Sequence, residues 1–169
     1  MKPLVLTVAL GLLAANVADA AGRRPPPLLA GMPKAEVKVE TSSGTHRFQA
    51  WIAADPASRE RGLMFVRKLP ADHGMLFLLE RPQFTAFWMK DTFLSLDIVF
   101  IRGDGTVSNV VHGAPPGSLQ PIPSTAPVIA VLEVIAGTAE RIGLRAGDRV
   151  ELPSGFAAGG DASRREGGQ

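Results

Sequence analysis

The chain has 169 residues, with 18 lysines and arginines against 16 aspartates and glutamates, which gives a formal net charge of +2. It has no cysteine, which excludes disulfides, thiolate metal sites, cysteine nucleophiles and the lipid anchor of a bacterial lipoprotein. The basic residues are scattered and form no stripe interleaved with aromatic residues, so the sequence predicts no nucleic-acid partner.

Residues 1–20 have the pattern of a secretory signal peptide. Lys2 precedes a compact apolar run over residues 4–15, which is too short to span a bilayer comfortably. Residues 18–20 read Ala-Asp-Ala and match the small-x-small cleavage pattern, so we expect cleavage after Ala20. The alternative is a short anchor left in place. We predict a periplasmic or secreted protein without a permanent membrane anchor.

The rest of the chain divides into a linker, one domain and a tail. Residues 21–32 are rich in proline and are expected to form a linker that has no helix and buries little. Residues 33–153 are long enough for one domain with its own core. Residues 154–169 are rich in Gly, Ala, Ser and charged residues, a composition typical of a disordered tail.

The first half of the domain begins with a predicted hairpin and a short helix. Apolar and polar residues alternate over 35–41, a turn is expected at 42–44, and the return strand covers 46–53. Asp55 is a good N-cap and Pro56 suits the first position of a helix. We therefore expect a helix from about residue 57 to about residue 64.

The second half contains nearly continuous apolar runs. Residues 74–79 and 97–101 are expected to be central strands that are covered on both faces. The proline-rich residues 112–127 are expected to form a long surface loop, and loops of this length are often functional. Further strands are predicted at 106–111, after a tight turn at 103–105, and at 128–134 and 149–152, with one helical turn at 138–142.

These elements predict a mostly β fold of about seven strands, most of them antiparallel, with two short helices. The expected architecture is a sandwich, a jelly-roll-like domain or a partly closed barrel.

The usual catalytic motifs are missing. The three histidines show no zinc-ligand spacing, no serine lies in a nucleophile elbow, and no glycine-rich phosphate or dinucleotide motif occurs. Three single methionines of the central block could serve a copper(I) site, but their apolar surroundings favour core packing. The sequence predicts no metal and no cofactor.

Two carboxylates lie inside apolar strands, and each must be paired or hydrogen-bonded because an unpaired buried charge costs several kcal/mol. They are Asp97 and Glu133. One interpretation is structural, with cations locking helix to sheet; the other is a polar pocket for a small anionic or polar ligand. The available cations are Arg59, Arg61, Arg67 and Lys90.

The sequence Trp88-Met89-Lys90 is the most specific candidate for ligand contact. In a strand, Trp88 and Lys90 would share one face and could bind a ligand through stacking and a charge-assisted hydrogen bond. The alternative is a half-buried Trp88 with the Lys90 side chain passing over it to reach solvent.

Five segments occur in this order: RERGLMFVRKLPADHGMLFLL, FWMKDTFLSLDIVFI, GDGTV, VIAVLEVIAG and GLRAGDRV. Together they resemble the DUF192 family, a bacterial and archaeal domain of unknown function, over about residues 35–152. The resemblance implies a mostly β, sandwich- or jelly-roll-like domain that is frequently exported. It implies no established activity.

The resemblance also assigns family positions to individual residues of this chain. The family usually has Asn at the position of Asp91 and Pro at that of Ser95, and Asp91 could weaken an anion site or pair with Lys90. The signature falls on Arg61, Gly62, Leu63, Met64, Gly74, Met75, Leu76, Phe77, Trp88, Met89, Lys90, Thr92, Leu96, Asp97, Glu133, Gly137, Gly147 and Asp148.

We expect Lys90 and Asp97 to belong to one polar cluster with Arg61 at an edge of the sheet. The candidate ligand-binding residues are Arg61, Trp88, Lys90, Thr92, Asp97 and Glu133. The first hypothesis is a non-catalytic binding module for a small polar or anionic ligand, such as a sugar.

Two other functions stay open. One is a hydrolase-type enzyme that uses the Asp97 and Glu133 carboxylates as acid and base. The other is a structural or protein-interaction domain whose polar cluster only fixes the fold. The sequence does not identify a protein partner.

Overall fold

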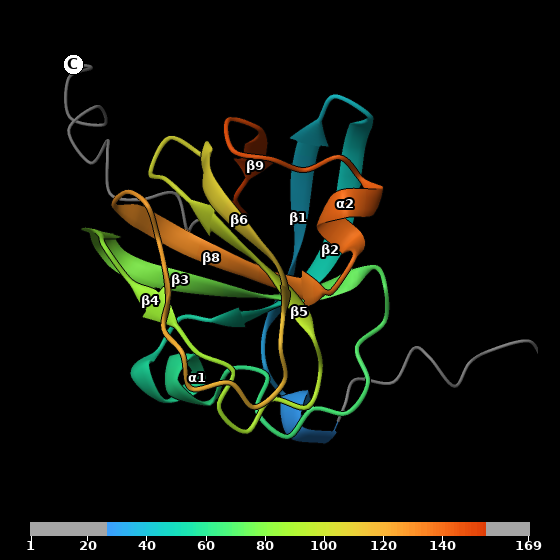
Figure 1. Cartoon of the computed structure of the whole chain (residues 1–169), viewed down its shortest axis with the longest axis vertical. Coiled ribbons are helices and arrows are strands. Elements are labelled where there is room, and N and C mark those ends of the chain that lie inside the picture. The colour runs from blue at the N-terminus through green and yellow to red at the C-terminus, as the bar shows by residue number, and fades with distance from the viewer. Residues whose placement is uncertain (1–26, 155–169) are drawn as a thin grey trace, which may run out of the picture.

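The structure is a computed structural model that describes residues 27–154 (Figure 1). The expected signal peptide, residues 21–26 of the expected linker, and residues 155–169 of the expected tail lie outside the described residues. No helix within residues 27–154 is long and apolar enough to cross a membrane. The elements in chain order are the 3-10 helix η1 (Pro27–Leu29), β1 (Lys34–Thr41), β2 (Gly44–Ala53), α1 (Pro56–Arg61), β3 (His73–Gln83), β4 (Ala86–Phe87), β5 (Leu96–Ile101), β6 (Val107–Ala114), β7 (Ile122–Pro123), β8 (Val128–Ile135), α2 (Thr138–Arg141) and β9 (Arg149–Glu151).

Seven of the strands form one sheet in the order β6-β5-β8-β3-β2-β1-β9. All neighbouring strands in it are antiparallel except β2 and β3, which are parallel. The sheet curls into a half-barrel whose two edges meet where Thr106 pairs with Arg149 and where the amide of Val107 donates to the carbonyl of Asp148 at 2.8 Å. The prediction of a mostly β fold with about seven strands and two short helices is confirmed.

Local sequence signals explain the first elements. The alternating pattern pairs β1 with β2 as a hairpin, in which Val37 lies opposite Phe48. The Asp55 side chain accepts a hydrogen bond from the amide of Ser58 at 3.0 Å, and Pro56 occupies the first turn of α1, as the sequence predicted. The helix ends at Arg61 and not near residue 64, because Gly62 has a φ of 49° and leaves the helical path.

Both faces of the central strands are buried, as their continuous apolar runs predicted. One core lies on the face covered by α2 and contains Val37, Phe48, Leu76, Val99, Leu132 and Ala139. The other lies on the opposite face, toward α1 and η1, and contains Leu29, Trp51, Leu63, Met75, Phe77, Ile98 and Val131. The prediction that residues 21–32 bury little is wrong for Leu29, which is 1% exposed.

The proline-rich loop after β6 packs back onto the segment around residue 90. It contains β7, which pairs with β4 so that Ile122 lies opposite Phe87. The amide of Met89 donates to the carbonyl of Ser118 at 2.9 Å, and the amide of Gly117 donates to the carbonyl of Thr92 at 3.1 Å. These bonds hold the segment that follows β4 against the proline-rich loop.

Candidate ligand-binding site

A cavity of about 280 Å³ lies between the end of α1, strand β3 and the segment around β4. Its size is close to the lower end of the range typical of small-molecule sites. We call it the Glu133 cavity, after the residue on β8 that reaches it from the centre of the sheet. It is lined by Arg59, Glu60, Arg61, Gly62, Leu63, Met64, Phe77, Leu79, Thr85, Ala86, Phe87, Trp88, Thr92 and Glu133.

The chain reversal after α1 forms one wall of the cavity. Gly62 has φ 49° and ψ −136°, a conformation that only glycine adopts readily. A Cβ atom on Gly62 would lie 3.2 Å from Cζ of Phe77, so a larger residue would crowd the ring. The glycine therefore lets the residues that follow α1 pack closely over the β3 side chains.

Glu133 is the buried polar group of this cavity. It lies opposite Met75 of β3 and Ile98 of β5, and therefore points to the same face of the sheet as these two apolar residues. The Glu133 side chain is 4% exposed, and no hydrogen bond or ion pair to its carboxyl group exists within residues 27–154. Glu133 is one of the residues that line the Glu133 cavity, so its carboxyl group faces this space.

Burial changes the protonation of this carboxyl group. Desolvation raises the pKa of Glu133 from 4.5 to about 8. At pH 7 the group is therefore mostly protonated, and it can donate one hydrogen bond as well as accept others. A carboxyl group in this state can bind a polar ligand directly, and it ionises when a positive charge comes close.

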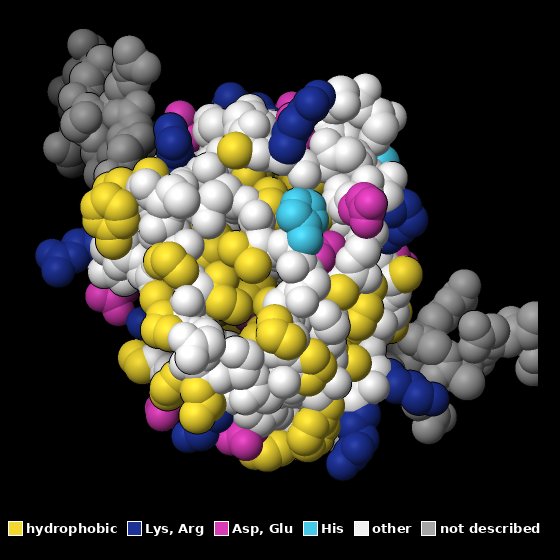
Figure 2. All heavy atoms as spheres, viewed as in Figure 1, with side chains coloured by type: hydrophobic (Ala, Val, Ile, Leu, Met, Phe, Trp, Pro, Cys, Tyr) yellow, Lys and Arg dark blue, Asp and Glu magenta, His cyan; other side chains and the backbone are white. Residues whose placement is uncertain are grey.

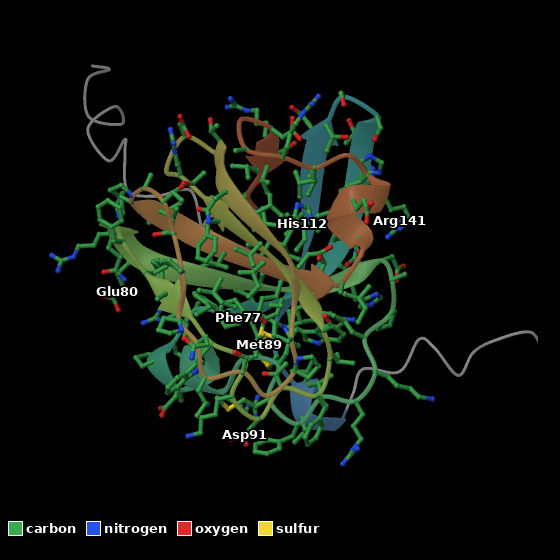
Figure 3. All side chains as sticks on the ribbon, in the orientation of Figure 1. Phe77, Glu80, Met89, Asp91, His112 and Arg141 are labelled. Carbon is green, nitrogen blue, oxygen red and sulfur yellow. The ribbon has the colours of Figure 1, made fainter. Side chains whose placement is uncertain are left out.

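Aromatic rings form the apolar part of the wall. Phe77 and Phe87 meet edge to face with centroids 4.8 Å apart, and Phe87 also contacts Phe100 in the same way at 6.1 Å. Trp88 lines the cavity but is 51% exposed, which places it at the rim. Figure 3 shows Phe77 and Met89 between the sheet and the loop that carries Asp91.

Two arginines, Arg59 and Arg61, line the cavity, and they differ in how many contacts their guanidinium groups already make. The Arg59 guanidinium donates to the carbonyls of Leu78, at 3.1 Å, and of Ala54, and it forms an ion pair with Glu80 at 3.5 Å. Arg61 is exposed and lies 3.5 Å from the sulfur of Met32. Arg59 therefore contributes mainly to structure, while Arg61 lies at the rim.

Of the six candidate ligand-binding residues, the structure brings four to this cavity: Arg61, Trp88, Thr92 and Glu133. Thr92 is 6% exposed, and its hydroxyl donates to the carbonyl of Lys90 at 3.1 Å. The ammonium group of Lys90 lies 5.6 Å from the centroid of the Trp88 ring. Lys90 itself is exposed and lines a separate hollow with Asp91, Phe93, Pro116, Gly117 and Leu119.

Asp97 lies on the other face of the sheet. Its carboxylate is 0% exposed and accepts hydrogen bonds from the amide of Gly113 at 2.9 Å and from that of Ala139 at 2.8 Å. Asp97 pairs with Val134, the neighbour of Glu133, so the two carboxyl groups point in opposite directions. The expected cluster of Lys90 with Asp97 is therefore wrong, and the sheet separates the two carboxyl groups that the alternative hydrolase hypothesis needs at one site.

Strand β4 ends at Phe87, so Trp88-Met89-Lys90 is not a strand; Trp88 and Met89 have no regular secondary structure, and a turn begins at Lys90. Asp91 continues this turn with a φ of 53°, and its carbonyl accepts a hydrogen bond from the amide of Phe65 at 2.8 Å. Asp and Asn both tolerate this left-handed conformation better than most residues. The departure from the family's Asn is thus compatible with the backbone.

Several cavity residues were not among the sequence candidates, notably Glu60, Thr85 and Phe87. Phe87 lies in an apolar stretch of the sequence, and that pattern does not show whether its ring faces a cavity or the core. Thr85 lies in a connection without a motif. Within residues 27–154, no group of three or more His, Cys, Asp or Glu side chains is arranged to hold a metal ion.

Comparison with known proteins identifies the domain. Solved structures similar to it include a Sinorhizobium meliloti 1021 protein described as a "putative transcription regulator", with 44% identity over 71% of this chain and 94% of that one and a TM-score of 0.69. A second is a protein of unknown function from Novosphingobium aromaticivorans DSM 12444, with 37% identity over 79% of this chain and 97% of that one and a TM-score of 0.72. No match was found among curated proteins. The model of the DUF192 family, described as "Uncharacterized ACR", matches residues 37–152, and the chain therefore belongs to this family.

Proposed function

We propose that this protein is an exported, non-catalytic binding module that holds a small polar ligand in the Glu133 cavity. One observation carries the proposal: a buried carboxyl group, without a partner among the described residues, faces a cavity that is large enough for a small molecule. Export follows from the signal-peptide pattern of residues 1–20.

The two buried carboxyl groups of the sheet support this proposal by contrast. Asp97 has two backbone donors and a clear structural role. Glu133 has no such partner, and its raised pKa means that burial opposes ionisation. A group that only stabilised the fold would be expected to resemble Asp97. A ligand that hydrogen-bonds Glu133 explains why the chain keeps a polar residue there.

The alternatives receive less support. Hydrolysis by two carboxylates needs both at one cleft, whereas Asp97 and Glu133 lie on opposite faces. An anionic ligand would have to approach a carboxyl group, although Arg61 at the rim could attract it. A polar ligand with a hydrogen-bond donor fits better.

The basic residues of strands β1 and β2 support the prediction that no nucleic acid is bound. Lys38 pairs with Glu151 at 3.0 Å and Arg47 with Glu36 at 2.9 Å. Figure 2 shows hydrophobic side chains over the middle and the lower end of one face, with Lys and Arg side chains around its edge. This face presents no continuous basic surface of the kind that binds phosphates.

Native mass spectrometry of the mature protein, from Ala21 onward and purified gently after exported expression, tests the proposal. We expect an adduct of defined mass on the wild type and its loss in Glu133→Gln. Glu140→Gln is the matched control and should keep the adduct, because Glu140 is an exposed carboxyl group on α2, at the other face of the sheet. A bare mass across several wild-type preparations, or an adduct that Glu133→Gln retains, would contradict the proposal.

A further inference from the structure

We infer that the ligand of the Glu133 cavity carries a primary ammonium group on a small apolar body, and that this group forms an ion pair with the Glu133 carboxylate against the aromatic wall. The inference rests on the proposed function and names its ligand class.

The first argument concerns the charges that face Glu133. Its direct neighbours on β3 and β5 are Met75 and Ile98, which are apolar. Apart from Glu133 itself, the ionisable residues that line the cavity are Arg59, Glu60 and Arg61, all on α1. The Arg59 guanidinium is engaged by two carbonyls and Glu80.

Glu60 and Arg61 are both exposed, and they carry opposite charges. The charge that Glu133 acquires on ionisation is therefore not compensated by a neighbouring side chain deep in the cavity. A ligand cation would supply this compensation, and it would do so in a site of low dielectric constant, where the attraction is strong. An anion would meet no buried cation at that position.

The second argument concerns the aromatic wall. Phe77, Phe87 and Trp88 all line the cavity that Glu133 reaches. Aromatic faces attract ammonium groups, and the attraction grows when the cation is desolvated. The wall also includes Leu63 and Leu79, which would pack against the apolar body of the ligand. The combination of one carboxylate, aromatic rings and aliphatic side chains matches an amine attached to a ring or a short chain.

The binding step has a defined proton balance. Before binding at pH 7, Glu133 is mostly protonated and the free amine is an ammonium ion. The ion pair needs the carboxylate, so the carboxyl proton leaves to solvent while the ammonium keeps its own protons. Affinity should therefore increase with pH as Glu133 ionises near pH 8, and should decrease above the pKa of the amine.

Isothermal titration calorimetry with three probes that share one ring tests the inference: benzylamine, benzyl alcohol and benzoate. At pH 7 we expect benzylamine to bind more tightly than the other two probes. Glu133→Gln should lower the affinity for benzylamine at least tenfold, because the amide side chain cannot ionise. It should change the affinity for benzyl alcohol much less. Glu140→Gln is the matched control, since it removes an exposed carboxyl group on α2, at the other face of the sheet, and it should leave all three affinities unchanged. Titrations in two buffers with different ionisation enthalpies should show release of close to one proton per benzylamine bound.

The outcomes separate this inference from the proposed function. If benzyl alcohol or benzoate binds more tightly than benzylamine and depends on Glu133, the site stands and the ammonium assignment is wrong. Benzylamine binding that Glu133→Gln leaves unchanged, or that releases no proton, also overturns the assignment. If none of the three probes binds at millimolar concentration, the ammonium inference fails, and the proposed function then depends on the adduct found by mass spectrometry.

Discussion

Asp97 and Glu133 are buried carboxyl groups on neighbouring strands, and they point to opposite faces of the sheet. The same chemical group has a different role at each position. Asp97 satisfies the amides of Gly113 and Ala139 and thereby ties β5 to β6 and α2. Glu133 faces an open cavity without such bonds in the described part of the chain. The sequence singled out both residues, because each interrupts an apolar strand. It could not separate their roles, since the partners of Asp97 are 16 and 42 residues away.

The raised pKa of Glu133 predicts a pH-dependent stability that the Glu133→Gln variant lacks. The folded state holds the proton up to about pH 8, whereas the unfolded chain releases it near pH 4.5. The free energy of unfolding should therefore fall between these two pH values, by up to about 5 kcal/mol from this group, and level off above pH 8. In Glu133→Gln this contribution is absent, so the variant should gain stability relative to the wild type as pH rises.

Urea denaturation of both proteins at pH 5, 6, 7, 8 and 9 measures this difference. A constant difference between the two proteins across this range would show that Glu133 ionises normally in the folded state.

Asp97→Ala should destabilise the protein by about 3 kcal/mol, because it leaves two buried amide donors without an acceptor. Lys90→Ala is the informative comparison, since the sequence suggested that the two residues form a pair. Lys90 is exposed and its loss should change the free energy of unfolding by less than about 0.5 kcal/mol. Equal losses in the two variants, measured by urea denaturation, would instead support the pair.

At the scale of the elements, strand β3 carries a glycine, Gly74, opposite Val134 of β8, the residue that follows Glu133. A Cβ atom on Gly74 would lie 2.6 Å from the backbone carbonyl oxygen of Glu133. The absence of a side chain at Gly74 therefore allows the backbone of β8 at Glu133 to pair closely with β3.

Gly74→Ala should destabilise the protein by at least about 2 kcal/mol, because the new methyl group would collide with backbone that cannot move alone. Gly103→Ala is the matched control: its nearest contact would be an ordinary 3.8 Å, to Pro82, and its φ is not in the left-handed region. Thermal denaturation should show a large loss for the first variant and almost none for the second. Similar melting temperatures would mean that the strands are farther apart than described.

Most elements could be predicted because their signals are local. The alternation of β1, the N-cap Asp55 and the apolar run of β8 each act within a few residues. Strands β4 and β7 were not predicted, since each has two residues and forms only because the long loop folds back over Phe87. The segment Trp88-Met89-Lys90 was considered as a strand, but its path depends on the same loop, because the amide of Met89 donates to the carbonyl of Ser118.

The whole molecule is a curled sheet with one core on each face, and this arrangement depends on contacts that a linear sequence does not display. The sequence predicted the number of strands but not their order, in which β8 lies between β3 and β5 and the parallel pair β2–β3 joins the two halves. The segment before β1 was expected to be an unpacked linker. Its residue Leu29 instead completes the core that lies on the cavity side of the sheet.

Leu29→Ala should therefore cost about 3 kcal/mol of stability, as expected for a buried leucine. Leu28→Ala serves as the control, because the neighbouring leucine is 40% exposed. We expect the midpoint of urea denaturation to fall clearly in the first variant and to stay within error in the second. Two unchanged midpoints would show that residues 21–32 behave as the linker that the composition suggested.

The central claim is that Glu133 is a buried carboxyl group that stays protonated at neutral pH and faces an open cavity. The most direct test is a pH titration of the side-chain carboxyl carbon of Glu133 by NMR, assigned with the Glu133→Gln variant. The structure predicts a midpoint near pH 8 for the free protein. A midpoint between pH 4 and 5 would mean that the carboxyl group is solvated or paired, and would contradict both the site and the ligand assigned to it.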